Sequence, residues 1–264
     1  MSAQPGLDNK EEALVSRKDG TAGLFRSPDL KELYSKKYDD KMQQWRTLGA
    51  IDKARNIECM VGSVRAAIES VLEVGCGTGA VLQQVAARKI GTRFTGIEIG
   101  TERSVQTQLG GLHIHGYDGQ AIPYHDQSFD LVYATHVLEH VMDERRFLGE
   151  LRRVSRRFIY IEVPCELHLR TTRRALQETL NIGHINAYTP DSFALQLETS
   201  GLVVRKLQVF DHSYAVHRFS SPAWRAILKT AARRGLLSLS ESIACRVCTY
   251  HCGALCEPGP LLST

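Results

Sequence analysis

Three glycines within Ser70–Gly79 are spaced G-x-G-x-G. Val71, Leu72 and Val74 precede them and are typical of a buried strand, whereas residues 80–89 (AVLQQVAARK) predict a helix. The glycines therefore lie at a strand-to-helix junction. There the backbone can turn sharply, a ligand can approach closely, and the helix start offers free N–H donors. This pattern predicts a cofactor-binding turn.

Two acidic residues narrow the kind of cofactor. Glu98 lies near the end of a second predicted strand, residues 93–100, where an acid can hold ribose hydroxyls. Glu73 lies in the strand just before the turn, where it would repel a pyrophosphate and attract a cation. The glycine spacing also differs from the G-x-G-x-x-G of dinucleotide sites. These features favour S-adenosylmethionine (SAM), which carries an ammonium and a sulfonium but no phosphate, over NAD.

Longer stretches resemble the motifs of class I SAM-dependent methyltransferases, in the methyltransferase type 11 group. The stretches are LEVGCGTG, GIEIG, YDGQAIPYHDQSFDLVYATHVLEHV and GHINAYTPDSF, within residues 70–201. The resemblance implies an α/β fold with a Rossmann-like, doubly wound, seven-stranded and mostly parallel sheet, whose last strand is antiparallel. It also implies a helical N-terminal lid.

The same resemblance implies a set of cofactor-binding residues. Those expected around the methionine part of SAM are Glu73, Gly75, Cys76, Gly77 and Gly79. Those expected at the ribose and adenine are Glu98, Ile99, Asp118 and Gly119. Thr135 and His136, at the end of the fourth strand, would lie near the methyl group. Taken singly, Glu98 could equally be a strand-end carboxylate and Asp118 a turn former. Cys76 is expected to be a small filler and not a nucleophile.

The remaining elements suggest how the domain is organised. Tyr38 and Arg46 lie on helical segments that resemble a lid closing over the methionine end of SAM. We expect a strand at 157–163, a helix between Thr189 and Gly201, and strands at 202–210 and 249–257. The expected divisions are a flexible tail at 1–25, the lid at 26–62, and the SAM-binding domain at 63–264 with acceptor-side insertions at 165–188 and 211–248.

The helix predicted after Pro222 is basic and amphipathic. Its apolar stripe consists of Trp224, Ile227, Leu228 and Ala231, and its flanking basic residues are Arg225, Lys229, Arg233 and Arg234. Such a helix can lie on a membrane surface or pack on its own protein, and we expect packing.

Composition bounds the function classes. The 264 residues are 43% apolar, which suits a single domain, and we find no signal peptide or apolar span. Seven cysteines without an evident disulfide framework predict a cytoplasmic protein. Residues 151–264 carry 15 Lys and Arg against 8 Asp and Glu, which could suit an anionic acceptor.

A cluster of basic residues, Arg152, Arg153, Arg156 and Arg157, is expected to form a solvated helix end. Basic residues are not interleaved with aromatic ones, which disfavours nucleic acid. Cys245, Cys248, Cys252 and Cys256 crowd into one short segment instead of two separated pairs, so no metal site is predicted.

The sequence thus predicts a methyltransferase that moves the SAM methyl group to oxygen or nitrogen of a small molecule and leaves S-adenosylhomocysteine. The methyl group would move by in-line displacement, for which positioning provides much of the acceleration. If the acceptor is a hydroxyl, His184, His136 or His140 could take its proton, and His184 is the first choice because it lies in the acceptor-side loop. A structural role for His140 and His184 stays open. The alternatives are a methyltransferase acting on RNA or protein, and a SAM-binding protein without catalysis. The sequence does not indicate the oligomeric state.

Overall fold

The computed structural model describes residues 40–99 and 112–260. Within them, seven strands form one sheet in the order β3-β2-β1-β4-β5-β7-β6. The strands are β1 (Ser70–Val74), β2 (Arg93–Ile99), β3 (Leu112–Tyr117), β4 (Phe129–Thr135), β5 (Ser155–Cys165), β6 (Leu202–Phe210) and β7 (Tyr250–Pro258). Strands β1 to β5 pair in parallel, whereas β7 runs antiparallel between β5 and β6. This topology confirms the predicted α/β sheet.

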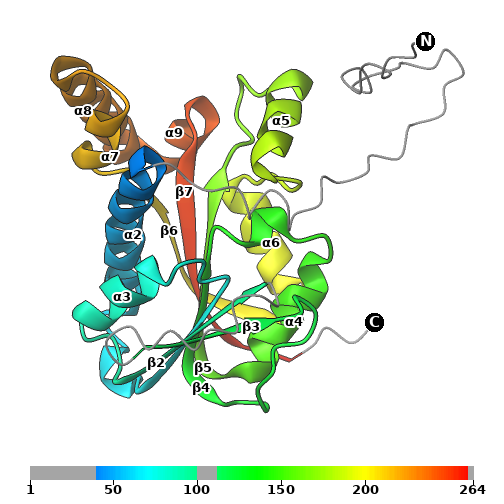
Figure 1. Cartoon of the computed structure of the whole chain (residues 1–264). Coiled ribbons are helices and arrows are strands. Elements are labelled where there is room, and N and C mark those ends of the chain that lie inside the picture. Colours follow the sequence, from blue (N-terminus) through cyan, green and yellow to red (C-terminus); the bar gives the residue numbers. More distant parts are fainter. Residues whose placement is uncertain (1–39, 100–111, 261–264) are drawn as a thin grey trace, which may run out of the picture.

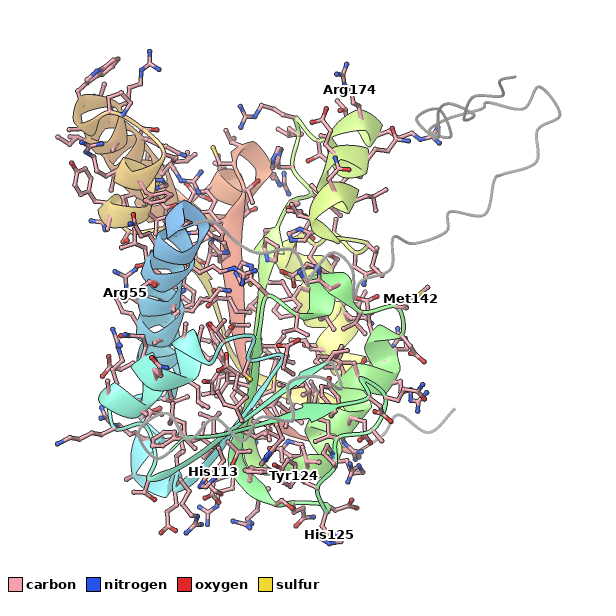
Figure 2. The ribbon with its side chains drawn as sticks, viewed as in Figure 1. Arg55, His113, Tyr124, His125, Met142 and Arg174 are labelled. Carbon is pink, nitrogen blue, oxygen red and sulfur yellow. The ribbon has the colours of Figure 1, made fainter. Side chains whose placement is uncertain are left out.

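Helices cover both faces of the sheet (Figure 1). They are α2 (Asp40–Val61), α3 (Ala80–Ala87), α4 (Glu144–Val154), α5 (Arg173–Thr179), α6 (Pro190–Glu198), α7 (Tyr214–Phe219), α8 (Ala223–Leu239) and α9 (Glu241–Val247), with short 3-10 turns η1 (Arg65–Ala67), η2 (Leu138–His140) and η3 (Leu180–Ile182). Helices α2 and α3 cover one face, and α4 and α6 cover the other. Arg55 on α2 and Met142 after η2 project outward on these two sides (Figure 2). Because both faces are covered, every residue of the central strands β1 and β4 is buried.

The first described helix, α2, is part of the core. Its residues Ala50, Ala54 and Ile57 are buried against α3 and the sheet. Half of the segment predicted as a lid therefore packs as a regular layer of the fold. Tyr38 lies outside the described residues, and the closing role of this segment stays a prediction.

The later elements follow the sequence prediction closely. Helix α6 begins after Thr189, whose side chain forms a capping box with Ser192, and the Gly201 N–H donates to the Glu198 carbonyl beyond its end. Strand β6 has the predicted bounds. Strand β5 is longer than predicted and continues through Pro164.

One prediction about the basic cluster was wrong. Arg156 and Arg157 lie on β5, not on a helix end, because α4 stops at Val154. The Arg156 guanidinium lies 2.8 Å from an Asp130 carboxylate oxygen. The cluster thus includes residues fixed by ion pairs within the fold.

The packing predicted for α8 was also wrong. Trp224, Ile227 and Leu228 are each more than half exposed, and the buried side of the helix instead carries Ala226 and Thr230. The helix is attached through smaller residues, so its largest apolar side chains face outward.

Candidate active site

The turn between β1 and α3 has the backbone that its glycines predict. Gly75, Gly77 and Gly79 all have positive φ, which side chains other than glycine rarely adopt. A Cβ at Gly75 would lie 2.5 Å from Val137, and one at Gly79 would lie 2.5 Å from Ile114. A Cβ at Gly77 would meet nothing within 4 Å. Two glycines thus permit close packing, whereas Gly77 borders open space where a ligand can approach the backbone.

Glu98 lies against this turn. One carboxylate oxygen accepts from the Gly77 N–H and the other accepts from the Ile99 N–H at 3.1 Å. The side chain of Ile99 is half exposed and faces Gly119, where an added Cβ would lie 3.1 Å from the Ile99 Cδ1. The structure therefore brings the ribose and adenine candidates next to the glycine turn.

Asp118 has a local role in the turn after β3. Its Oδ1 accepts from the backbone N–H groups of Gln120 and Ala121 at 2.7 and 3.1 Å. These backbone hydrogen bonds lower the pKa of this exposed carboxyl below its usual value. The turn-forming interpretation is confirmed, and a contact with adenine stays a prediction.

Glu73 is deeply buried in β1. It accepts a hydrogen bond from the Tyr133 hydroxyl at 3.2 Å, and only 2% of the residue is exposed. Burial raises the pKa of Glu73 to about 8, although Tyr133 and the nearby Lys53 oppose the shift. The carboxyl is therefore mainly neutral near pH 7 and would ionise more readily beside the positive charges of SAM.

The other cofactor candidates lie around these groups. Cys76 is buried, and its Sγ lies 2.8 Å from where a Cβ at Gly96 would be, which fits the predicted filler role. Thr135 is the buried last residue of β4. Arg46 lies on α2. The pKa of Lys53 is lowered mainly by burial, and the positive charge of Arg46 adds to this shift.

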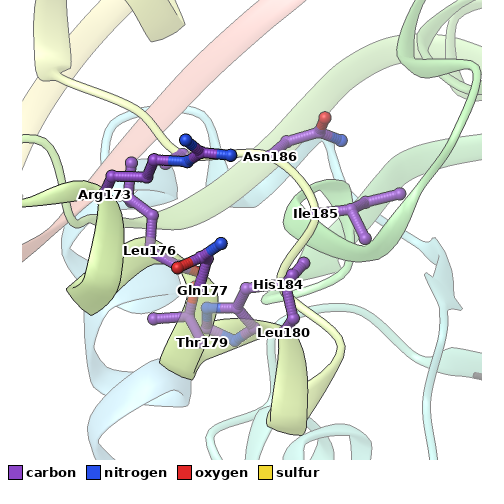
Figure 3. Close-up of a pocket in the computed structure, with 9 residues that line it drawn as sticks. Arg173, Leu176, Gln177, Thr179, Leu180, His184, Ile185 and Asn186 are labelled. Carbon is purple, nitrogen blue, oxygen red and sulfur yellow. The ribbon is translucent and has the colours of Figure 1, made fainter. Parts of the chain in front are cut away.

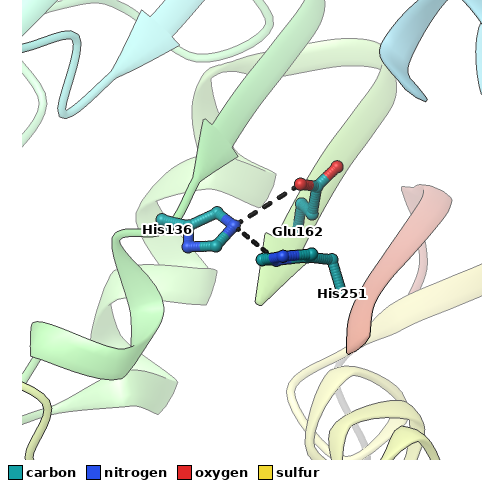
Figure 4. A group of neighbouring side chains, drawn as sticks. All are labelled: His136, Glu162 and His251. Carbon is teal, nitrogen blue, oxygen red and sulfur yellow. Dashed lines mark hydrogen bonds and ion pairs between the residues drawn. The ribbon is translucent and has the colours of Figure 1, made fainter. Parts of the chain in front are cut away.

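Beyond β4 lies a cluster of buried and partly buried ionisable side chains that we call the histidine cluster: His136, Glu139, Glu162, His212 and His251. His136 Nε2 lies 3.0 Å from His251 Nδ1 and 3.5 Å from a Glu162 oxygen (Figure 4). His136 Nδ1 faces Glu139 at 3.3 Å, and His251 Nε2 lies 2.9 Å from His212 Nε2.

The three histidines of this cluster have different electrostatics. Burial and the nearby Lys53 oppose protonation of His136, but its close contacts with the carboxylates of Glu139 and Glu162 prevail and raise its pKa. Burial lowers the pKa of His251 well below its usual value and that of His212 to about 4. Of these three histidines, His136 is therefore the one that most readily carries a proton.

His184 belongs to a second group, on the loop before α6. Its Nδ1 lies 3.0 Å from both carboxylate oxygens of Glu166, and its ring packs edge-on against His140 at 4.8 Å between centroids. It lines an open hollow of about 240 Å³ together with Leu176 and Ile185 (Figure 3). His140 Nδ1 donates to the Gly183 carbonyl at 2.9 Å, which ties the turn after β4 to the loop that carries His184.

Glu162, Glu166, His212 and His251 were missed as candidate functional residues. None of them lies in a recognised motif. Glu162, His212 and His251 converge only when β5, β7 and the segment after β6 come together, whereas Glu166 meets His184 in the second group. Within residues 40–99 and 112–260, the groups able to hold an ion combine histidine and glutamate, and none includes a cysteine.

A family model for the methyltransferase domain matches residues 30–207, about two thirds of the chain. The chain belongs to this methyltransferase family. Its sheet order, glycine turn and strand-end acid are those expected of the class I SAM-dependent branch, so SAM is the cofactor that the family uses.

Similar proteins include both O- and N-methyltransferases. The O-methyltransferase cnsE of Penicillium expansum is 33% identical over 95 residues, which cover 33% of this chain and 34% of that protein. The ajmaline N-methyltransferase of Rauvolfia serpentina is also 33% identical over 95 residues, covering 33% of this chain and 32% of that protein. These matches span about a third of the relatives' length.

A solved geranyl diphosphate methyltransferase in complex with SAM shares the fold, with a TM-score of 0.56 and 10% identity over 86% of this chain and 94% of that one. Among the helices that the structure describes, none is both long and apolar enough to cross a bilayer.

Proposed function

We propose that this methyltransferase transfers the methyl group of SAM to oxygen or nitrogen of a small-molecule acceptor. The observation that carries the proposal is the open side of the glycine turn at Gly77, with Glu98 hydrogen-bonded to its N–H group. Open space beside a backbone N–H and a carboxylate suits a ribose and an amino-acid moiety, and the start of α3 adds further N–H donors. The names of the O- and N-methyltransferase relatives support both acceptor atoms.

The acceptor side would lie beyond β4, where His136 follows Thr135 and Val137 packs against Gly75. In-line displacement at the methyl group requires the acceptor atom directly behind it, so holding the acceptor in place is the main catalytic task. His184 is the proposed base for a hydroxyl acceptor, because Glu166 fixes its Nδ1 and orients the ring. His140 would position this loop through Gly183.

A small acceptor is favoured over RNA because several basic side chains are engaged within the fold. Arg152 donates to the Gly259 carbonyl, and Arg153 is bound by Glu150 and Asp126. Such residues are poorly placed to form an open basic groove along a polymer. The seven cysteines are free thiols, which supports a reducing compartment such as the cytoplasm.

The test is an activity screen with SAM carrying a labelled methyl group. Purified protein is incubated with panels of phenols, amines and carboxylates, and in parallel with bulk RNA and with a protein extract. We expect S-adenosylhomocysteine to form only when a suitable small molecule is present, with the label on that molecule. Label found only in RNA or protein would contradict the proposal, and so would tight SAM binding with no turnover across the panels.

A further inference from the structure

We infer that His136, Glu162 and His251 bind a divalent transition-metal ion such as Zn²⁺, Fe²⁺ or Mn²⁺. The three residues lie just after β4, within β5 and within β7, so the site exists only in the folded sheet. Its use in holding the methyl acceptor rests on the proposed function, whereas metal binding itself does not.

The spacing of the three ligand atoms suits one ion. His136 Nε2, His251 Nδ1 and a Glu162 oxygen all lie within 4.8 Å of one another. The separation of the two nitrogens is 3.0 Å, and that between His136 Nε2 and the Glu162 oxygen is 3.5 Å. Two ligands bound at about 2.1 Å to one metal, at tetrahedral to octahedral angles, lie about 3.0 to 3.4 Å apart. The two separations that involve His136 are thus already close to those of a metal complex, and all three atoms lie within 4.8 Å of one another.

Each ligand is also held from behind by a second residue. Glu139 faces the far nitrogen of His136 at 3.3 Å, and His212 lies 2.9 Å from the far nitrogen of His251. The second oxygen of Glu162 accepts from Asn56 Nδ2 at 3.1 Å and from the Tyr160 hydroxyl. Metal-binding histidines and carboxylates are commonly oriented in this way through the atom that does not bind the metal. The arrangement leaves one atom of each residue directed at a common point.

The backbone of His136 supports a functional role for this arrangement. Its φ is 57°, in the left-handed region that is costly for a residue with a Cβ. The same residue donates its N–H to the Glu162 carbonyl at 2.9 Å, which ties the two ligand-bearing segments together. The fold thus maintains an unfavourable backbone conformation at the residue that links Glu139 to the other two ligands.

Charge favours a cation at this point. Glu139 and Glu162 are 0% and 1% exposed, and neither Glu139 oxygen has a hydrogen bond of good geometry. Lys53 also faces these carboxylates and offsets part of their charge. Two imidazoles and one carboxylate form a ligand set typical of zinc or iron, whereas magnesium prefers oxygen ligands alone. A metal held by three ligands keeps positions for an acceptor oxygen, whose pKa it would lower.

The experiment uses the full chain without a histidine tag, after treatment with a chelator. Co²⁺ is titrated by calorimetry and by visible absorption, because its spectrum reports the ligand set. We expect one equivalent to bind, with no sulfur-to-cobalt charge-transfer band. Glu162→Gln and His251→Asn should each weaken binding at least 100-fold, while His113→Asn, on an exposed histidine of β3, should bind like the parent. Circular dichroism checks that each variant is folded.

Failure of Co²⁺ to bind the parent would overturn the inference. So would unchanged binding in folded Glu162→Gln, or loss of binding in His184→Asn alone, which would place the ion at the other group of Glu139, His140 and His184. SAM affinity is measured on the same preparations. If the parent binds SAM but no Co²⁺, the metal site is refuted and the proposed function is unaffected. If the parent binds Co²⁺ but not SAM, the proposed function is refuted and the metal site stands.

Discussion

The cofactor side and the acceptor side of the site are built in different ways. The cofactor side uses residues close together in sequence, from Gly75 to Gly79 with Glu98 on the neighbouring strand. The acceptor side draws His136, Glu162, His212 and His251 from four segments spread over more than 100 residues. The first is largely a property of one strand-turn-strand unit. The second depends on how β5 and β7 pair across the sheet.

The two sides also differ in their chemistry. The cofactor side offers backbone N–H groups and carboxylates, which suit a ligand with hydroxyls and positive charge. The acceptor side offers imidazoles, each held by a partner of its own. Changes to the first side should therefore affect SAM affinity, and changes to the second should affect turnover.

The largest effect is expected at Gly77. Gly77→Val places a β-branched side chain at positive φ and in the open space that the cofactor would use. SAM binding measured by calorimetry should be abolished while the fold is largely kept. The matched control is Gly149→Ala. A Cβ at Gly149 also meets nothing within 4 Å, but this residue lies on α4, away from the glycine turn in the sequence. If Gly77→Val binds SAM like the parent, the cofactor does not use this turn.

His184→Gln tests the acceptor side. A general base contributes typically about 10²- to 10⁴-fold to rate, so turnover of the true acceptor across pH should fall by such a factor. SAM affinity should hardly change, because His184 lies on the loop before α6 and not at the glycine turn. Glutamine keeps the size and hydrogen bonding of the side chain, so a loop-ordering role would tolerate the change. Near-parental turnover would remove His184 from catalysis.

Glu98→Ala sharpens the assignment within the cofactor side. Charge-assisted hydrogen bonds are worth about 1.5 to 3 kcal/mol each, so SAM affinity should fall at least about tenfold. Asp118→Ala should have a smaller effect, because Oδ1 of Asp118 is engaged with the Gln120 and Ala121 N–H groups. Calorimetry on both variants provides the comparison. Equal affinities for Glu98→Ala and the parent would show that the ribose lies elsewhere.

A prediction of a different kind concerns stability and Glu73. Burial raises its pKa to about 8 in the folded chain, against about 4.3 for an unperturbed glutamate. Between those values the folded state keeps a proton that the unfolded state has lost, so the stability contribution present at low pH is lost as pH rises toward 8.

Glu73→Gln should remove this loss. Relative to the parent, the variant should gain up to about 1.4 kcal/mol per pH unit between about pH 5 and pH 8, as measured by urea unfolding. Glu69→Gln, on an exposed glutamate, is the control. An identical pH dependence in the parent and Glu73→Gln would mean that Glu73 is ionised in the folded protein.

The comparison also explains what could be predicted from the sequence. Glycine spacing, strand patterns and the Thr189 helix cap are local, so they indicated the turn, the single strands and α6 correctly. The arrangement of the strands in one sheet was implied by the family resemblance. The packing predicted for the apolar stripe of α8 was wrong, because periodicity identifies an apolar face of a helix but does not show which element covers it. His251 could not be recognised in advance, because its partners come from β4, β5 and the segment after β6.

The most direct test of the account is calorimetry of the parent chain with SAM, S-adenosylhomocysteine and NAD. The spacing of the glycine turn, with Glu98 beside it, predicts that SAM and S-adenosylhomocysteine bind at a single site and that NAD does not. Binding of NAD in preference to SAM would contradict the assignment of the turn and, with it, the proposed methyl transfer.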